Sequence, residues 1–281
     1  MEQHLGPRVA VVNVPRVNNR DRTHAIPGAH SVTLRMLLVA LVFALGLVSP
    51  SAHAARQDLT VQEQYELGMR YMKRGYYVKA LEEFTKIRTQ HPDDPFADEA
   101  AIAIADLHFK KAEWDQARVA YEEFLRLHPR HERVHYVVYR LGLTAFKKAP
   151  RIAARDQTWT RQAVNTWTGF EARYAGSEYV DEVNQSLAEA RDRLAHKEFI
   201  IGEFYFKRKA YVGALGRLEG MLRLYPGCSD SADALAMIAV ARFKTGDEAA
   251  ALEALGRLQT DFPDDPALRL VRRKAPELLR E

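Results

Sequence analysis

Small and bulky apolar residues alternate with polar ones along this chain in a pattern that repeats. One column of glycine or alanine recurs at intervals of 37, 37, 60 and 37 residues, at Gly68, Ala105, Gly142, Gly202 and Ala239. A second column follows it at Ala80, Ala117, Ala163, Ala214 and Ala251. Each member of the first column sits in a helix-like stretch that begins a helix–turn–helix unit. The pattern therefore predicts five such units in sequence.

The columns have a simple physical reason. Two antiparallel helices approach closely only where side chains are small, and larger apolar residues then fill the space around them, as Tyr71, Phe84, Tyr121, Phe124, Tyr205, Leu218 and Leu255 do here. Proline ends the second helix of a unit because it cannot continue the hydrogen-bond ladder, and it recurs at Pro92, Pro129, Pro226 and Pro263. One unit cannot bury its apolar face alone, so neighbouring units are expected to stack into a solenoid.

The first unit matches a known repeat. The tetratricopeptide pattern has Leu-Gly, then Tyr, Ala, Phe and Pro over ~34 residues. This chain has Leu67-Gly68, Tyr71, Ala80, Phe84 and Pro92 at that spacing. We therefore predict an all-α fold, a tetratricopeptide-repeat solenoid of five helix–turn–helix units.

The third unit interrupts the rhythm. Its first helix is expected to stop at Pro150, a loop with Arg155-Asp156 to cover residues 151–158, and a second helix to run over about 159–174. After Gly176-Ser177 no proline occurs up to Lys209, which predicts a long helix of roughly 30 residues, about 45 Å, linking units 3 and 4. The predicted division is residues 55–176 for units 1–3, and 177–281 for the long helix, units 4–5 and a last capping helix over about 267–279.

The N-terminal region differs from the repeats. Residues 36–48, MLLVALVFALGLV, form an uncharged apolar run followed by Ala52-His53-Ala54. The run is too short to span a bilayer and is typical of a signal-peptide core, so we expect export to the periplasm with cleavage after Ala54; an N-terminal membrane anchor is the alternative. Residues 1–34 show no apolar periodicity, which suggests a misassigned start codon within the segment 1–54.

Charge and cysteine content narrow the range of functions that the sequence predicts. The chain has a formal net charge of +4, but without residues 1–54 it holds 36 basic against 35 acidic residues, so the basic balance does not predict nucleic-acid binding. The single cysteine, Cys228, lies in a predicted turn and has no cysteine to pair with. No cysteine lies near the predicted cleavage site, so no lipid-attachment site is expected there.

Motifs that carry chemistry are missing from the sequence. There is no glycine-rich phosphate loop, His-Glu-x-x-His, pair of cysteines or nucleophile elbow. His128 and His131 flank Pro129, which is more typical of a helix end than of a metal pair. We therefore predict a protein that binds other proteins rather than an enzyme, without a cofactor or metal.

The first helices carry a further column. Lysine recurs at Lys73, Lys110, Lys147, Lys207 and Lys244, each directly after a large apolar residue: Met72, Phe109, Phe146, Phe206 and Phe243. Seven and eight residues earlier lie Tyr65, Ile102, Tyr139 and Phe199. First helices line the concave face of such a solenoid, where these residues could hold a peptide with aromatic side chains and a carboxylate. Alternatively, the helix dipole favours lysine in a last turn, and the aromatic residues belong to the core.

Several stretches together resemble one family. They are Tyr136–Leu143 (YVVYRLGL), the Arg155-Asp156 loop, Asp192–Glu198 (DRLAHKE) with Glu203-Phe204-Tyr205 and Lys207-Arg208 after it, and Arg217 with Glu219–Leu222 (EGML). Over about residues 59–265 the chain resembles the BamD (ComL-like) tetratricopeptide lipoproteins of the outer-membrane β-barrel assembly machinery.

The resemblance implies a periplasmic scaffold at the inner face of the outer membrane, with other assembly-complex subunits as partners. Its N-terminal units would receive signals of unfolded outer-membrane proteins, through a set that combines the resemblance with the columns: Tyr65, Met69, Met72, Lys73, Phe109, Lys110, Tyr139 and Phe146. Its C-terminal units would dock the periplasmic domain of a BamA-like barrel protein through Glu203, Lys207, Arg208 and Arg217.

Two points stay open at this stage. Family members are normally lipid-anchored, so membrane association here would be indirect, through a partner. The alternative functions are another periplasmic tetratricopeptide adaptor of an envelope or cell-division complex, or an accessory that regulates an enzyme through the same groove.

Overall fold

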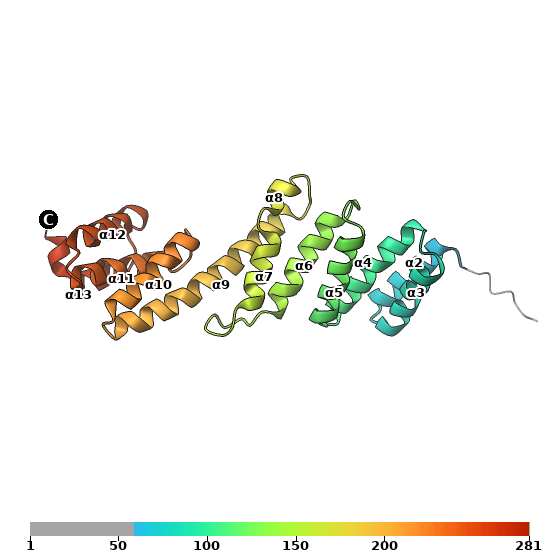
Figure 1. Cartoon of the computed structure of the whole chain (residues 1–281), viewed down its shortest axis with the longest axis horizontal. Coiled ribbons are helices and arrows are strands. Elements are labelled where there is room, and N and C mark those ends of the chain that lie inside the picture. Colours follow the sequence, from blue (N-terminus) through green and yellow to red (C-terminus); the bar gives the residue numbers. More distant parts are fainter. Residues whose placement is uncertain (1–58, 281) are drawn as a thin grey trace, which may run out of the picture. The chain divides into compact units, whose positions relative to one another are not determined.

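Consecutive helices pack against one another along the chain in the computed structural model, which describes residues 59–280 (Figure 1). No strand occurs in this range. The predicted units appear as the pairs α2 (Val61–Lys73) with α3 (Tyr77–Gln90), α4 (Pro95–Lys110) with α5 (Trp114–Leu127), α6 (Val134–Lys148) with α7 (Thr158–Trp167), α9 (Val180–Lys207) with α10 (Tyr211–Leu224), and α11 (Ser231–Lys244) with α12 (Glu248–Asp261). The predicted all-α repeat fold is confirmed, whereas the predicted signal segment lies outside the described residues.

The column of small residues is where the paired helices touch. A Cβ atom added at three of the glycines would come within 2.6, 2.2 and 2.6 Å of the facing side chain, in the pairs Gly68 with Phe84, Gly142 with Trp167, and Gly202 with Leu218. Ala105 and Ala239, the other members, are fully buried. Each facing side chain comes four residues after the alanine column, so the two sequence columns describe one recurrent contact.

Helix starts follow the expected capping chemistry. Thr60 and Glu63 form a capping box on α2, with Glu63 N donating to Thr60 Oγ1 at 3.2 Å and Thr60 N donating to Glu63 Oε2 at 2.9 Å. Asp94 Oδ1 accepts from Phe96 N at 2.8 Å at the start of α4. The recurrence of the Pro-Asp-Asp-Pro sequence gives the same bond, from Ala267 N to Asp265 Oδ1 at 2.8 Å, one turn before α13 (Leu268–Lys274).

In four of the five units, the turn between the two helices contains a left-handed residue. Gly75 and Gly246 supply it with φ of 79° and 85°. In units 2 and 4 the same position is occupied by Ala112 and Lys209, with φ of 58° and 61°. A residue with a Cβ is strained in this conformation, so the turns of units 2 and 4 are less favourable than the glycine turns of units 1 and 5.

The second helix of unit 3 corrects the prediction of one helix over about 159–174. Helix α7 ends at Trp167, Gly169 takes φ of 73°, and α8 (Phe170–Arg173) is a separate single turn. The break is stabilised by Arg173, whose Nη2 donates to the carbonyl oxygens of Thr166 and Thr168 at 3.3 and 3.2 Å. The bend lets Trp167 and Phe170 both become buried.

The last predicted helix, over about 267–279, is also broken. It consists of α13 and a 3₁₀ turn, Pro276–Leu279. Pro276 disfavours helical backbone at the residue before it, and Ala275 has φ of −146° and ψ of 59°.

The predicted long helix is confirmed. Helix α9 has 28 residues, about 42 Å at the helical rise, and passes from beside α7 and α8 to beside α10 (Figure 1). Its N-terminal half buries Val183, Leu187 and Ala190 with the core of unit 3. Its C-terminal half buries Phe199 and Phe206 with the core of α10–α13. One helix therefore belongs to two cores.

Candidate protein-binding surfaces

The predicted N-terminal set divides between surface and core. Tyr65 on α2 is half-buried, with its ring centroid 5.6 Å from that of Phe84 and 5.3 Å from that of Phe96. Met69 is 38% exposed one turn further on. Met72, at 7% exposed, packs inside the first core instead. Tyr65 and Met69 are thus available to a ligand, and the placement of Met72 favours the alternative that it is a core residue.

The aromatic residues of units 2 and 3 have intramolecular partners. Phe109 on α4 packs edge-on against Trp114, with centroids 5.1 Å apart, and the Arg140 guanidinium lies 3.8 Å from its ring centroid. Tyr139 on α6 stacks on Tyr179, with centroids 4.9 Å apart and an interplanar angle of 9°. Both residues remain half-exposed, so each presents part of a ring that is already held in place.

Phe146, unlike Phe109 and Tyr139, lies in the buried core of unit 3. It is 8% exposed, packs on Trp167 and is covered by the Arg193 guanidinium, 4.3 Å from its ring centroid.

Lys73 and Lys110 are in the last turns of α2 and α4, at the solvent-facing side of the units. Neither lysine has an ion-pair or hydrogen-bond partner among the described residues, which is compatible with the helix-dipole interpretation because the dipole acts without a specific contact.

A polar network that sequence reasoning missed connects α4, α5 and α6. Asp106 accepts a hydrogen bond from Tyr121 Oη at 2.5 Å and one from Tyr136 Oη at 2.7 Å. The Arg140 Nε atom lies 3.2 Å from Asp106 Oδ1, and both side chains are largely buried. Burial and the Asp106 charge raise the pKa of Tyr121 and of Tyr136 above the usual range, so both phenols stay protonated donors.

A second charged pair continues this network toward Tyr65. Arg133 Nη1 lies 2.5 Å from Glu99 Oε2, and the guanidinium stands 4.6 Å from the Tyr136 ring centroid. Burial, and next the Glu99 charge, raise the pKa of Tyr65. The sequence signal was available: Asp106 and Arg140 are charged residues inside otherwise apolar stretches of the first helices. We define Tyr65, Glu99, Asp106, Phe109, Arg133, Tyr136, Tyr139 and Arg140 as the N-terminal surface.

The predicted C-terminal residues lie on α9 and α10. Lys207 Nζ pairs with Glu203 Oε1 at 2.6 Å, and Arg217 Nη1 on α10 pairs with Glu198 Oε2 at 3.0 Å. The Arg208 guanidinium lies 4.3 Å from the centroid of the Phe204 ring. The structure thus brings these residues onto the exposed faces of one helix pair.

Exposed apolar side chains accompany these charges and were missing from the predicted set. Phe204, Tyr205 and Val212 are 49%, 36% and 77% exposed around the turn between α9 and α10. Neighbouring exposed apolar side chains with charged groups around them are typical of a protein-binding surface. We define these three residues with Glu203, Lys207, Arg208 and Arg217 as the C-terminal surface.

His128 and Cys228 make contacts within the protein. His128 Nδ1 lies 3.2 Å from Asp98 Oδ2, and the ring stacks on Phe124 with centroids 5.0 Å apart. Cys228 Sγ lies 3.3 Å from Ser231 Oγ in the turn between α10 and α11. Within residues 59–280 no cluster of three or more His, Cys, Asp or Glu side chains could hold a metal ion. In the same range no helix has the length and apolar character to cross a membrane.

Comparison with known proteins gives a consistent result. The family described as YfiO, outer membrane lipoprotein, matches residues 57–266. A protein named outer membrane protein assembly factor BamD from Xylella fastidiosa (strain 9a5c) is 28% identical over 257 residues, covering 88% of each chain. The protein of the same name from Neisseria meningitidis serogroup A (strain DSM 15465 / Z2491) is 26% identical, covering 75% of this chain and 83% of that one.

Among solved structures, a thermophilic TPR protein from Thermus thermophilus is 21% identical, covers 78% of this chain and 100% of that chain, and has a TM-score of 0.32. The fold assignment rests on the helix pairs of the chain itself rather than on this likeness. The family match and the sequence relatives confirm the resemblance predicted from the sequence.

Proposed function

Because the chain belongs to the YfiO family of outer membrane lipoproteins, we propose that it is an outer-membrane protein assembly factor acting as a non-enzymatic periplasmic scaffold. The observation that carries the proposal is the match over 88% of a relative that is itself named an outer membrane protein assembly factor. The presence of one surface on units 1–3 and another on α9 and α10 supports a protein with two kinds of partner.

The N-terminal surface suits a peptide that ends in an aromatic residue and a carboxylate, the expected signal of an unfolded outer-membrane protein. Glu99 engages one guanidinium nitrogen of Arg133, and Asp106 engages one of Arg140, which fixes the orientation of both groups. Their remaining N–H groups would donate to an incoming carboxylate. Tyr65, Phe109 and Tyr139 offer ring faces and edges against which aromatic side chains pack well.

The C-terminal surface suits a folded partner, which we propose is the periplasmic domain of a BamA-like barrel protein. Phe204 and Tyr205 supply the aromatic anchors that dominate binding energy at many interfaces. Arg208 and Arg217 stand around them and would meet acidic groups of the partner. Arg217 is half-exposed and paired only with Glu198 among the described residues, so it can exchange that partner for one on another protein.

Co-purification tests this assignment. Tagged chain is recovered from detergent extracts of the native envelope, and co-purifying proteins are identified by mass spectrometry. We expect a BamA-like barrel protein with the wild-type chain and much less of it with Arg217→Glu. The matched control is Arg269→Glu, an exposed arginine on α13 outside both surfaces.

The outcomes separate the parts of the proposal. If no BamA-like protein co-purifies with the wild type, the docking proposal is wrong, and another envelope or cell-division complex in the eluate would identify the alternative adaptor role. If Arg217→Glu binds as well as the control, the surface is misplaced although the function stands.

A further inference from the structure

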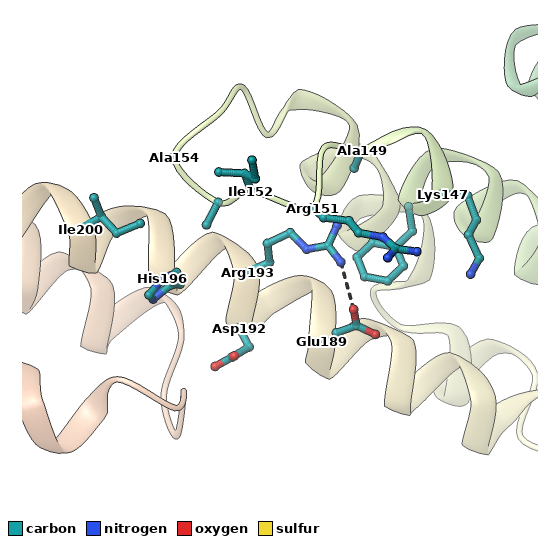
Figure 2. Close-up of a pocket in the computed structure, with 12 residues that line it drawn as sticks. Lys147, Ala149, Arg151, Ile152, Ala154, Glu189, Asp192, Arg193, His196 and Ile200 are labelled. Atoms are coloured by element: carbon teal, nitrogen blue, oxygen red, sulfur yellow. Dashed lines mark hydrogen bonds and ion pairs between the residues drawn. The ribbon is translucent and has the colours of Figure 1, made fainter.

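A pocket of about 700 Å³ lies between the interrupted loop of unit 3 and α9, apart from both surfaces described above (Figure 2). The 60-residue interval creates it, because the loop between α6 and α7 and the middle of α9 are the segments that depart from the 37-residue repeat. Loop residues Arg151, Ile152 and Ala154 face the helical residues Arg193, His196 and Ile200 across it.

Side-chain hydrogen bonds hold in place the loop that forms one wall of the pocket. Gln157 is fully buried, and its Nε2 donates to the carbonyl oxygens of Pro150 and Ile152 at 3.2 and 2.9 Å. Thr160 Oγ1 donates to Gln157 Oε1 at 2.5 Å. A pocket whose wall is fixed in this way needs little ordering when a ligand enters, which lowers the cost of binding.

The acidic groups and the histidine of the lining are already engaged. Arg193 pairs with Glu189 at 2.9 Å (Figure 2), and Asp192 accepts from Ser229 N at 2.7 Å and Ser229 Oγ at 3.0 Å. His196 Nδ1 lies 2.9 Å from Asp230 Oδ2. The charged and polar groups of α9 that line the pocket are therefore paired with other groups of the same chain.

Two cationic side chains that line the pocket have no partner within the described part of the chain. Lys147 and Arg151 are exposed, and neither has an ion-pair or hydrogen-bond partner among residues 59–280. Ile152 follows Arg151 in the loop and is 59% exposed, and Ile200 lies on α9 at the other end of the pocket from Lys147 (Figure 2). The lining thus combines unpaired positive charge with apolar surface.

We propose that this pocket binds an acidic peptide segment of a partner protein, with one bulky apolar side chain inserted against Ile152 and Ile200. The peptide's carboxylates pair with Lys147 and Arg151, the two cations of the lining that have no partner in the described part of the chain. The pocket volume is within the range of sites that enclose a few side chains.

Fluorescence anisotropy with a defined probe tests the proposal on the full chain. The probe is fluorescein-labelled Glu-Asp-Phe-Asp-Glu-amide, and its counterpart has lysine at each acidic position. We expect saturable binding of the acidic probe only, weakening as salt rises. Lys147→Glu with Arg151→Glu should raise the Kd about tenfold. The control reverses two exposed α13 arginines, Arg272→Glu with Arg273→Glu, and should leave the Kd unchanged.

A second variant tests the apolar part. Ile152→Ser should weaken binding several-fold without changing its salt dependence, because it removes apolar contact and no charge. Circular dichroism confirms that each variant is folded. Absence of saturable binding, equal binding of the lysine probe, or an unchanged Kd in the double charge variant overturns the proposal. None of these results bears on co-purification through Arg217, so the two proposals fail separately.

Discussion

Replacing Asp106 tests the buried network that fixes the N-terminal surface. Asp106→Ala removes the acceptor of two phenol hydrogen bonds and the partner of Arg140 in one step. Hydrogen bonds to a charged group contribute roughly 1.5–3 kcal/mol each, and breaking a largely buried ion pair leaves a desolvated charge behind. We expect the free energy of unfolding to fall by about 3–5 kcal/mol.

Two comparison variants show how much of that loss comes from one phenol of the network and how large the loss is for an exposed ion pair. Tyr121→Phe removes the phenol that donates to Asp106 and accepts from Arg140 Nε, while keeping a fully buried ring, so we expect a loss of about 1.5–3 kcal/mol. Asp115→Ala is the matched control on the next helix, since Asp115 is 62% exposed and pairs with Lys148 at the surface. Such exposed pairs contribute about 0–1 kcal/mol.

Urea denaturation followed by circular dichroism measures these losses, with the slope of the transition checked for each variant so that midpoints are comparable. Refutation would be a loss for Asp106→Ala no larger than that for Asp115→Ala. In that case water replaces the carboxylate without cost, and the network does not hold Arg140 and Tyr136 in place for a ligand.

Three further predictions follow from the repeats. Ala112→Gly and Lys209→Gly should each raise the unfolding free energy by about 0.5–1 kcal/mol in the same urea assay, because they relieve left-handed backbone at a non-glycine residue; a loss in both would contradict this. Gly142→Ala should cost about 2 kcal/mol by overpacking a buried indole, whereas Gly256→Ala, with open space at its Cβ, should be neutral or stabilising; equal effects would refute the close contact. Hydrogen bonds from Thr60 lower the pKa of Glu63 below its ordinary value, so the capping box stabilises α2 above that ordinary value and loses this stabilisation as pH falls through the lowered pKa. Glu63→Gln should flatten this pH dependence in hydrogen exchange of α2, and an unchanged profile would rule out the effect.

Contacts between the two helices of one unit could be predicted from sequence because they repeat. Gly68 and Phe84 are 16 residues apart, and the same pairing recurs in other units with a different large residue, Trp167 or Leu218. Repetition allows a contact to be recognised without knowing its geometry.

The polar network could not be predicted in this way because its partners occur once. Asp106 and Tyr136 are 30 residues apart and belong to neighbouring units. Glu203 occupies the position of Asp106 in unit 4, directly after the small column, but it pairs with Lys207 on its own helix. A charge in an apolar stretch therefore has more than one possible partner, and its position alone does not select one. Sequence reasoning named Tyr65, Phe109 and Tyr139 but missed Tyr136 and the charged groups that orient these rings.

Two glycines explain why one long helix was predicted correctly and another wrongly. Gly202 lies inside α9 without interrupting it, because it belongs to the repeating column and is needed where Leu218 packs against the helix. Gly169 lies outside that column, has nothing within 4 Å of its Cβ position, and adopts the left-handed backbone that separates α7 from α8. Gly202, in the small column, therefore serves close packing, and Gly169, outside that column, serves a turn. The predicted helix over 159–174 was wrong because Gly169 adopts left-handed backbone, which a continuous right-handed helix cannot contain.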